Sequence, residues 1–215
     1  QELRDLVDGF RASSTVQRGV ATVVPVARPR GELAGLLSAT YPDDRLADLT
    51  LAPPLRAAIE RVLTEQRQRS FLGEYGLFPA RRVLMTGSPG TGKTSTARAV
   101  AGELGLPLFA VRLDALITKY MGETAAKLRL VFDQLSEAHG VYLFDEVDAL
   151  ASERSLENDV GEIRRVINSF LQFLEEDPSD SIVLAASNHP GLLDRAFFRR
   201  FDVTLDFDLP DDAGV

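Results

Sequence analysis

The sequence predicts an α/β fold in which a five-stranded parallel sheet lies between helices. Short, continuous apolar segments alternate along the chain with amphipathic segments. Strands that are apolar throughout are typical of a parallel sheet covered by helices on both faces. The chain has 215 residues, of which 45% are hydrophobic and 26% charged, enough for one large domain with a buried core.

The first 45 residues read differently from the rest of the chain. Residues 1–12 predict a short amphipathic helix with apolar side chains at helical spacing. Residues 13–45 are interrupted by prolines and glycines, which predicts an irregular segment with one possible strand at VATVVPV. We therefore expect an attachment or linker segment over residues 1–45 and one α/β domain over residues 46–215.

From residue 46 onward, strands and helices alternate regularly. Pro53 and Pro54 favour the first turn of a helix that extends to about Arg69. The predicted strands are, in order, RRVLMTG, PLFAVRL, VYLFD, SIVLAAS and DVTLDFDL. Helices are predicted from about Gly92, over residues 123–138 and over residues 160–176.

The composition excludes several kinds of site. The chain has no cysteine, which excludes disulfides and thiolate metal sites and makes a reducing, cytoplasmic location the default. Its two histidines leave little room for a histidine-based metal centre. The net charge of −8 argues against a general nucleic-acid surface, because phosphate backbones are bound by clustered positive charge. No apolar run reaches the roughly 18–20 residues of a membrane span.

The segment GSPGTGKT, residues 87–94, matches the phosphate-binding pattern G-x-x-x-x-G-K-[ST] in full and follows a predicted strand directly. Glycines let the backbone curl so that its N–H groups converge on phosphates, and the following helix adds positive potential. Lys93 is expected to reach the β- and γ-phosphates, and Thr94 to hold Mg²⁺. The candidate nucleotide-binding residues of this segment are Gly87, Pro89, Gly90, Thr91, Gly92, Lys93, Thr94 and Ser95.

A second, acidic motif stands at the end of VYLFDEVD. Four apolar residues followed by an acid predict a buried strand that delivers Asp145 to the carboxyl edge of the sheet, where ligands bind in open α/β folds. Asp145 is expected to hold Mg²⁺ together with Thr94, and Glu146 to polarise an attacking water as general base. An isolated acidic pair is often a solvated strand end, but beside a phosphate loop it predicts ATP hydrolysis.

Five motifs in order, GSPGTGKT, KYMGET, YLFDEVDAL, AASNHP and LDRAFFRRFD, resemble those of AAA+ ATPases of the classical AAA clade. The resemblance runs from about residue 48 to residue 210. It implies the large subdomain of a P-loop ATPase that uses ATP and Mg²⁺ and assembles as a homo-oligomer, usually a hexameric ring. In relatives a small helical lid follows this subdomain. The lid is not present in this chain, which stops at Val215, so we expect the natural chain to continue.

The resemblance assigns further roles to single residues. Asn188 matches the sensor-1 position, which orients the attacking water, and Leu49 lies where relatives touch adenine, although the usual glycine is absent. Arg199 and Arg200 match the arginine-finger region, which reaches the nucleotide of the neighbouring subunit. Arg195 is a further candidate, and the sequence leaves open which arginine dominates.

Tyr120, Met121 and Gly122 lie between a predicted strand and a predicted helix and match the first pore loop of the family. An aromatic ring offers a large contact area, methionine adapts its shape, and glycine lets a loop bend. These properties predict that the segment grips an extended polypeptide. The alternative is that Tyr120 is simply a core residue, buried at the start of a helix. Residues 153–160 are polar and fit either a second pore region or a solvated face.

Two functions are compatible with these motifs. The first is a Mg²⁺-ATP-driven ring that threads, unfolds or remodels protein substrates in its central pore. The second is an ATP-switched assembly module of a larger complex, such as a bacterial defence or signalling system, with its effector elsewhere and an adaptor bound through residues 1–45. A nucleic-acid motor is disfavoured because the chain is acidic and lacks a basic-aromatic stripe. An arginine- and alanine-rich composition suggests a bacterial source.

Overall fold

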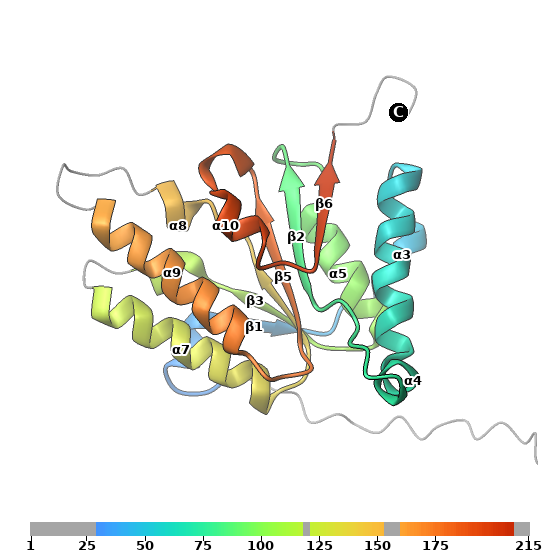
Figure 1. The fold of residues 1–215 in the computed structure, drawn as a ribbon, viewed down its shortest axis with the longest axis horizontal. Coiled ribbons are helices and arrows are strands. Elements are labelled where there is room, and N and C mark those ends of the chain that lie inside the picture. Colours follow the sequence, from blue (N-terminus) through green and yellow to red (C-terminus); the bar gives the residue numbers. More distant parts are fainter. Residues whose placement is uncertain (1–28, 118–120, 153–159, 209–215) are drawn as a thin grey trace, which may run out of the picture.

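The computed structural model describes residues 29–117, 121–152 and 160–208. Its centre is a six-stranded sheet in the order β1-β3-β4-β5-β2-β6 (Figure 1). The strands are β1 (Leu37–Thr40), β2 (Arg82–Gly87), β3 (Leu108–Val111), β4 (Val141–Phe144), β5 (Ile182–Ser187) and β6 (Val203–Phe207). Strands β2 to β6 pair in parallel, which confirms the predicted parallel sheet.

Strand β1 is a correction to the sequence analysis. It pairs antiparallel with β3, Leu37 opposite Val111, and so adds a sixth strand at the sheet edge. The prediction of an irregular segment is therefore wrong for residues 33–40, where Leu36 and Leu37 are each only 3% exposed. The physical reason is tertiary: a four-residue strand owes its conformation to the partner it pairs with. The predicted helix over residues 1–12 and the strand VATVVPV lie outside the described residues.

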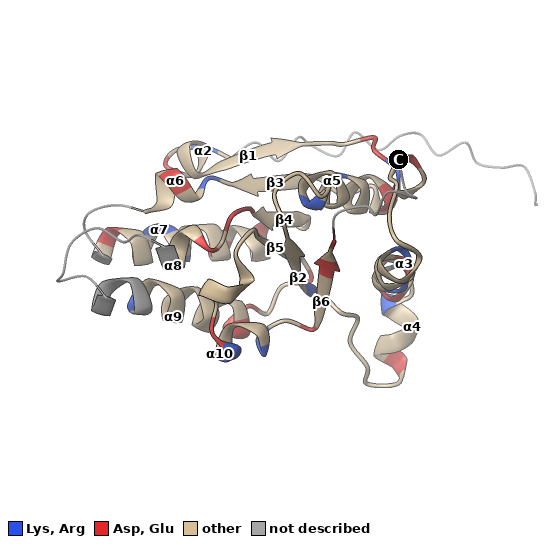
Figure 2. Cartoon of the chain, turned by 90° about the horizontal axis from the view of Figure 1, so that it is seen from above, with Lys and Arg blue, Asp and Glu red and all other residues tan. Residues whose placement is uncertain are grey.

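Helices cover both faces of the sheet (Figures 1 and 2). The longer ones are α3 (Pro53–Arg67), α5 (Lys93–Leu104), α7 (Met121–Glu137) and α9 (Val160–Glu176). The shorter ones are α2 (Leu33–Leu36), η1 (Leu46–Asp48), α4 (Arg69–Glu74), α6 (Leu113–Leu116), α8 (Ala149–Ser152), η2 (Pro190–Leu192) and α10 (Arg195–Phe198). Figure 2 shows basic and acidic residues interspersed along these elements.

The hydrophobic core has two parts because strand side chains alternate between faces. On β4, Tyr142 and Phe144 pack in the part beneath α7 and α9, whereas Val141 and Leu143 pack in the part beneath α3 and α5. All four side chains are at most 2% exposed. This burial fixes where β4 ends and therefore where the acidic motif after it begins.

Among the helices built from described residues, none combines the length and the hydropathy needed to cross a lipid bilayer.

Candidate active site

The glycine-rich segment lies at the carboxyl edge of the sheet, between the end of β2 and the start of α5. Gly87, Gly90 and Gly92 have φ angles of +144°, +80° and +97°, a region that L side chains avoid. A Cβ on Gly87 would lie 2.1 Å from the carbonyl oxygen of Phe207 in β6. Backbone conformation and the close approach of β6 thus both require glycine where the loop begins.

Lys93 is the first residue of α5 and is only 6% exposed. Its ammonium donates to the carbonyl oxygens of Gly87 and Ser88, at 2.6 and 2.8 Å, so the cation lies inside the loop. Burial lowers the pKa of Lys93, because the charged form loses hydration. The carboxylates that oppose this shift are those of Asp145, Asp148 and Glu146, in decreasing order.

The two side chains expected to hold Mg²⁺ are in contact. The hydroxyl of Thr94, in the first turn of α5, donates to Asp145 Oδ2 at 2.8 Å. Mg²⁺ is usually bound by one or two carboxylates together with waters and substrate phosphates. The described part of the chain contains no group of three or more His, Cys, Asp or Glu that could hold a metal by itself. This donor set therefore fits Mg²⁺ bound together with a nucleotide.

Glu146, the expected general base, occupies a strained turn directly after Asp145. Its φ angle is +56°, the one positive value at a non-glycine position among the described residues. The turn is closed by the N–H of Ala149, which donates to the Glu146 carbonyl at 2.8 Å. The Glu146 side chain is exposed, and its Oε1 accepts from Asn188 Nδ2 at 3.5 Å. The structure thus brings the expected base and the expected sensor together.

Asp148 is a functional candidate that the sequence analysis missed. It is 6% exposed, and its Oδ1 accepts the backbone N–H of Asn188 at 3.1 Å. One residue earlier, the N–H of Val147 donates to the carbonyl of Ala186 at 2.9 Å. These two hydrogen bonds attach the turn after β4 to the end of β5. The signal in the sequence was the second aspartate of DEVD, two residues beyond the general base.

The two adjacent arginines are placed differently. Arg199 is exposed, and no described residue forms an ion pair with it. Arg200 is half-buried and forms an ion pair with Glu175 of α9. Arg195, at the start of α10, is exposed. The structure therefore separates two side chains that the sequence could not distinguish.

The remaining candidate residues lie elsewhere. Leu49 is half-buried after η1, and its carbonyl accepts from Arg56 Nη2 at 2.6 Å. Tyr120 lies outside the described residues, as does the polar segment 153–159. Met121 is the first residue of α7, and Gly122, the second, is exposed.

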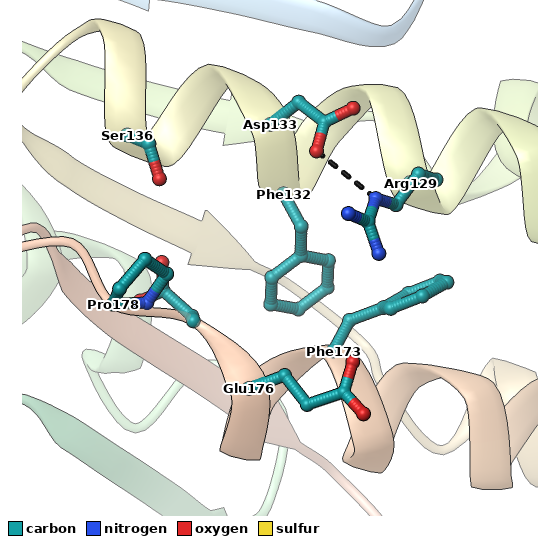
Figure 3. A pocket seen from close by; sticks show the side chains of 8 residues that line it. Arg129, Phe132, Asp133, Ser136, Phe173, Glu176 and Pro178 are labelled. Carbon is teal, nitrogen blue, oxygen red and sulfur yellow. Dashed lines mark hydrogen bonds and ion pairs between the residues drawn. The ribbon is translucent and has the colours of Figure 1, made fainter.

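A hollow of about 260 Å³ lies between α7 and α9, at the amino-terminal edge of the sheet and away from these motifs (Figure 3). Arg129 pairs there with Asp133 at 3.0 Å and stands 5.4 Å from the centre of the Phe173 ring. Asp177, also on its wall, pairs with Arg81. The hollow contains none of the motif residues, so the carboxyl edge remains the candidate active site.

Comparisons with known proteins give the following matches. The model of the ATPase family associated with various cellular activities (AAA) matches residues 83–209, more than half of the chain. The uncharacterized AAA family ATPase y4kL of Sinorhizobium fredii is 34% identical over 212 residues, 99% of this chain and 63% of that protein. The ATP-dependent zinc metalloprotease FtsH 1 of Symbiobacterium thermophilum is 37% identical over 178 residues, 79% of this chain and 30% of that protein.

Among solved structures, the crystal structure of the FIGL-1 AAA domain matches with a TM-score of 0.67 and 26% sequence identity. The match covers 83% of this chain and 59% of that one. The chain spans less than two thirds of the length of each of these relatives.

Proposed function

This chain belongs to the AAA family of ATPases, and we propose that it hydrolyses ATP with Mg²⁺ in a homo-oligomeric ring that grips, threads and remodels protein substrates. The observation that carries the ATPase part is the contact between Thr94 Oγ1 and Asp145 Oδ2. It joins the end of the phosphate loop, in the first turn of α5, to the acidic motif after β4. Mg²⁺-dependent phosphoryl transfer needs these two motifs side by side.

The residues of the site divide the work of hydrolysis. Lys93 and the N–H groups of the loop bind the phosphates, and Lys93 exchanges its present carbonyl partners for phosphate oxygens. Thr94 and Asp145 hold Mg²⁺, which supplies charge neutralisation on the phosphates when it is bound. Glu146 accepts a proton from the attacking water, and Asn188 orients that water. Their 3.5 Å separation is compatible with these roles, because catalytic hydrogen bonds tighten once substrate is bound.

One observation and one property of the family support a ring. Arg199 is exposed, and no described residue pairs with it, so its guanidinium is available to a neighbouring molecule. Members of the AAA family typically assemble as rings. In such an assembly Arg199 completes the nucleotide site of the next subunit, where it stabilises charge that develops on the transferred phosphoryl group.

The grip on protein substrates is proposed for Tyr120, Met121 and Gly122. Met121 and Gly122 are the first two residues of α7, and Tyr120 directly precedes them in the sequence. One relative is named as an ATP-dependent protease, and an enzyme of that kind handles polypeptides. A protein substrate is therefore favoured over other classes of cargo.

The test uses the full natural chain and three variants. Glu146→Gln should keep ATP binding and lose turnover by roughly 10²- to 10⁴-fold, the range of general-base contributions. Tyr120→Ala should keep basal turnover but lose its stimulation by unfolded casein. Phe78→Ala, at an aromatic residue that is 90% exposed, is the control and should retain that stimulation. Full turnover in Glu146→Gln contradicts the catalytic assignment. Full stimulation in Tyr120→Ala favours the assembly module instead.

A further inference from the structure

The turn that carries Arg199 and Arg200 is fixed by buried aromatic side chains on either side. Phe197 is 1% exposed and Phe201 is 9% exposed, with their ring centroids 5.3 Å apart. Asp194 caps the preceding helix, because its Oδ1 accepts the N–H of Phe197 at 2.8 Å. Since both phenylalanines point into the core, the directions open to the two arginines between them are restricted.

These restrictions separate the arginines. Arg199 points to solvent, and within the described ranges it has no ion-pair partner. Arg200 lies against α9, where its Nη1 donates to Glu175 Oε1. The Nε of Arg200 is buried and has no hydrogen-bond partner. The side chain of Arg200 is thus held against its own subunit, whereas the guanidinium of Arg199 can reach a neighbouring subunit.

The same turn is connected, through α9, to the strand that ends at the active site. The Phe197 ring stacks on Phe170 of α9 with centroids 5.9 Å apart. Phe170 in turn contacts Phe144 edge-on at 5.1 Å, and Phe144 is the residue directly before Asp145. A continuous series of aromatic contacts therefore joins the arginine turn to the acidic motif of the same subunit. Its middle ring, Phe170, belongs to α9, the helix that also carries Glu175.

We propose that the two arginines have separate tasks. Arg199 acts on the nucleotide of the neighbouring subunit, whereas Arg200 is a positioning residue that ties the arginine turn to α9 through Glu175. This inference rests on the proposed function, in which active sites form between subunits. It assigns a role to Glu175, which none of the sequence motifs includes.

The magnitudes separate the two tasks. A trans-acting arginine contributes roughly 10³- to 10⁵-fold to turnover in well-studied NTPases. The Glu175 and Arg200 side chains are 44% and 40% exposed, and an exposed ion pair contributes little, so the loss of either partner should cost roughly two- to fivefold. Arg200→Ala and Glu175→Ala should have equal effects that do not add in the double variant, because they remove the same contact.

The experiment measures ATP turnover per subunit against concentration of the full chain. We expect turnover to rise with concentration in the wild type and to collapse in Arg199→Ala. Arg200→Ala and Glu175→Ala should lose only a few fold, and the charge-swapped Glu175→Arg/Arg200→Glu chain should recover. Mixing Arg199→Ala with Glu146→Gln subunits should restore part of the turnover, because each supplies what the other lacks. Arg61→Ala, which breaks an exposed Arg61–Glu65 pair on α3, is the control and should be unchanged.

Two different results would overturn the inference. If Arg200→Ala collapses as deeply as Arg199→Ala and the charge swap does not recover, Arg200 itself acts on the neighbouring nucleotide and only the division of tasks is wrong. If wild-type turnover is independent of concentration and indifferent to Arg199, active sites do not form between subunits. In that case the proposed ring fails together with the inference.

Discussion

Replacing Asp148 with alanine tests whether this buried carboxylate positions the sensor residue. The change removes the acceptor of the Asn188 N–H, at 3.1 Å, and leaves that donor without its partner. A hydrogen bond to a charged group contributes about 1.5–3 kcal/mol, so we expect the free energy of unfolding to fall by about 2 kcal/mol. For a chain of this length that loss lowers the melting temperature by about 4–8 °C.

Turnover should fall more than stability alone explains. Asn188 contacts Glu146 through its side chain, and its backbone N–H is held by Asp148. Loss of the Asp148 contact should therefore also disturb the contact between Asn188 and Glu146. We expect a loss of about 10- to 100-fold in single-turnover hydrolysis, since an orienting contact is lost while the base remains. Binding of a fluorescent ATP analogue should be retained, because Asp148 makes no hydrogen bond to the phosphate loop among the contacts described. Its charge does act on Lys93, but the loss of a negative charge there does not oppose the binding of anionic phosphates. Asp148→Asn keeps an oxygen acceptor and should retain most of the turnover.

Two results would refute this reasoning. If Asp148→Ala melts earlier but hydrolyses ATP within twofold of the wild type, Asp148 is structural and Asn188 is positioned by other contacts. If Asp148→Asn loses as much turnover as Asp148→Ala, the charge of the carboxylate matters rather than its oxygen. Thermal unfolding and single-turnover hydrolysis of the same samples distinguish these cases.

Three further predictions concern backbone strain and a buried phenol. Gly87→Ala should abolish ATP binding and lower the melting temperature, because its Cβ would lie 2.1 Å from a carbonyl oxygen of β6. Gly73→Ala is the control and should do neither, because there is open space around Gly73. Glu146→Gly should lose turnover but raise the free energy of unfolding by about 1 kcal/mol in denaturant titrations. The relief of about 1–3 kcal/mol of backbone strain exceeds the roughly 0.4–1 kcal/mol that the freedom of glycine in the unfolded chain costs, so a destabilised variant would contradict the strain. Burial raises the pKa of Tyr142, whose hydroxyl has one proton to share between the carbonyl oxygens of Gln134, in α7, and Ala138, just after it. Because its folded pKa lies above the unfolded value of about 10, its stabilising effect is present below that pH and is lost as pH rises further. Tyr142→Phe should lack this alkaline loss, and equal pH profiles in urea unfolding would refute the assignment.

The parallel sheet could be predicted because each of its five strands is a local apolar pattern bounded by turn residues. Strand β1 could not, because Leu37–Thr40 is held by pairing with Leu108–Val111, far away in the sequence. The phosphate loop is a contiguous motif whose chemistry requires its residue types at fixed spacing. Its position between β2 and α5 agrees with the prediction.

The parts of the site that the sequence did not reveal are contacts between distant segments. Asp148 meets Asn188 forty positions later, and Glu175 meets Arg200 twenty-five positions later. Neither pair has a local pattern, because an acid after a strand and an acid at a helix end are both common on protein surfaces. Only the parallel pairing of β4 with β5, and the packing of α10 on α9, bring these side chains together.

The conformation of Glu146 links the fold to the proposed chemistry. After β4 the chain must place Asp145 against Thr94, yet only two residues later the N–H of Val147 bonds to the Ala186 carbonyl of β5. Glu146, the single residue between them, must reverse the direction of the chain. Its φ of +56° costs on the order of 1–3 kcal/mol for a residue with a side chain. Glycine would relieve that strain, so stability alone does not explain a glutamate at this position. A carboxylate held at the exposed tip of the turn, within reach of Asn188, is explained if its task is to act on water at the carboxyl edge of the sheet.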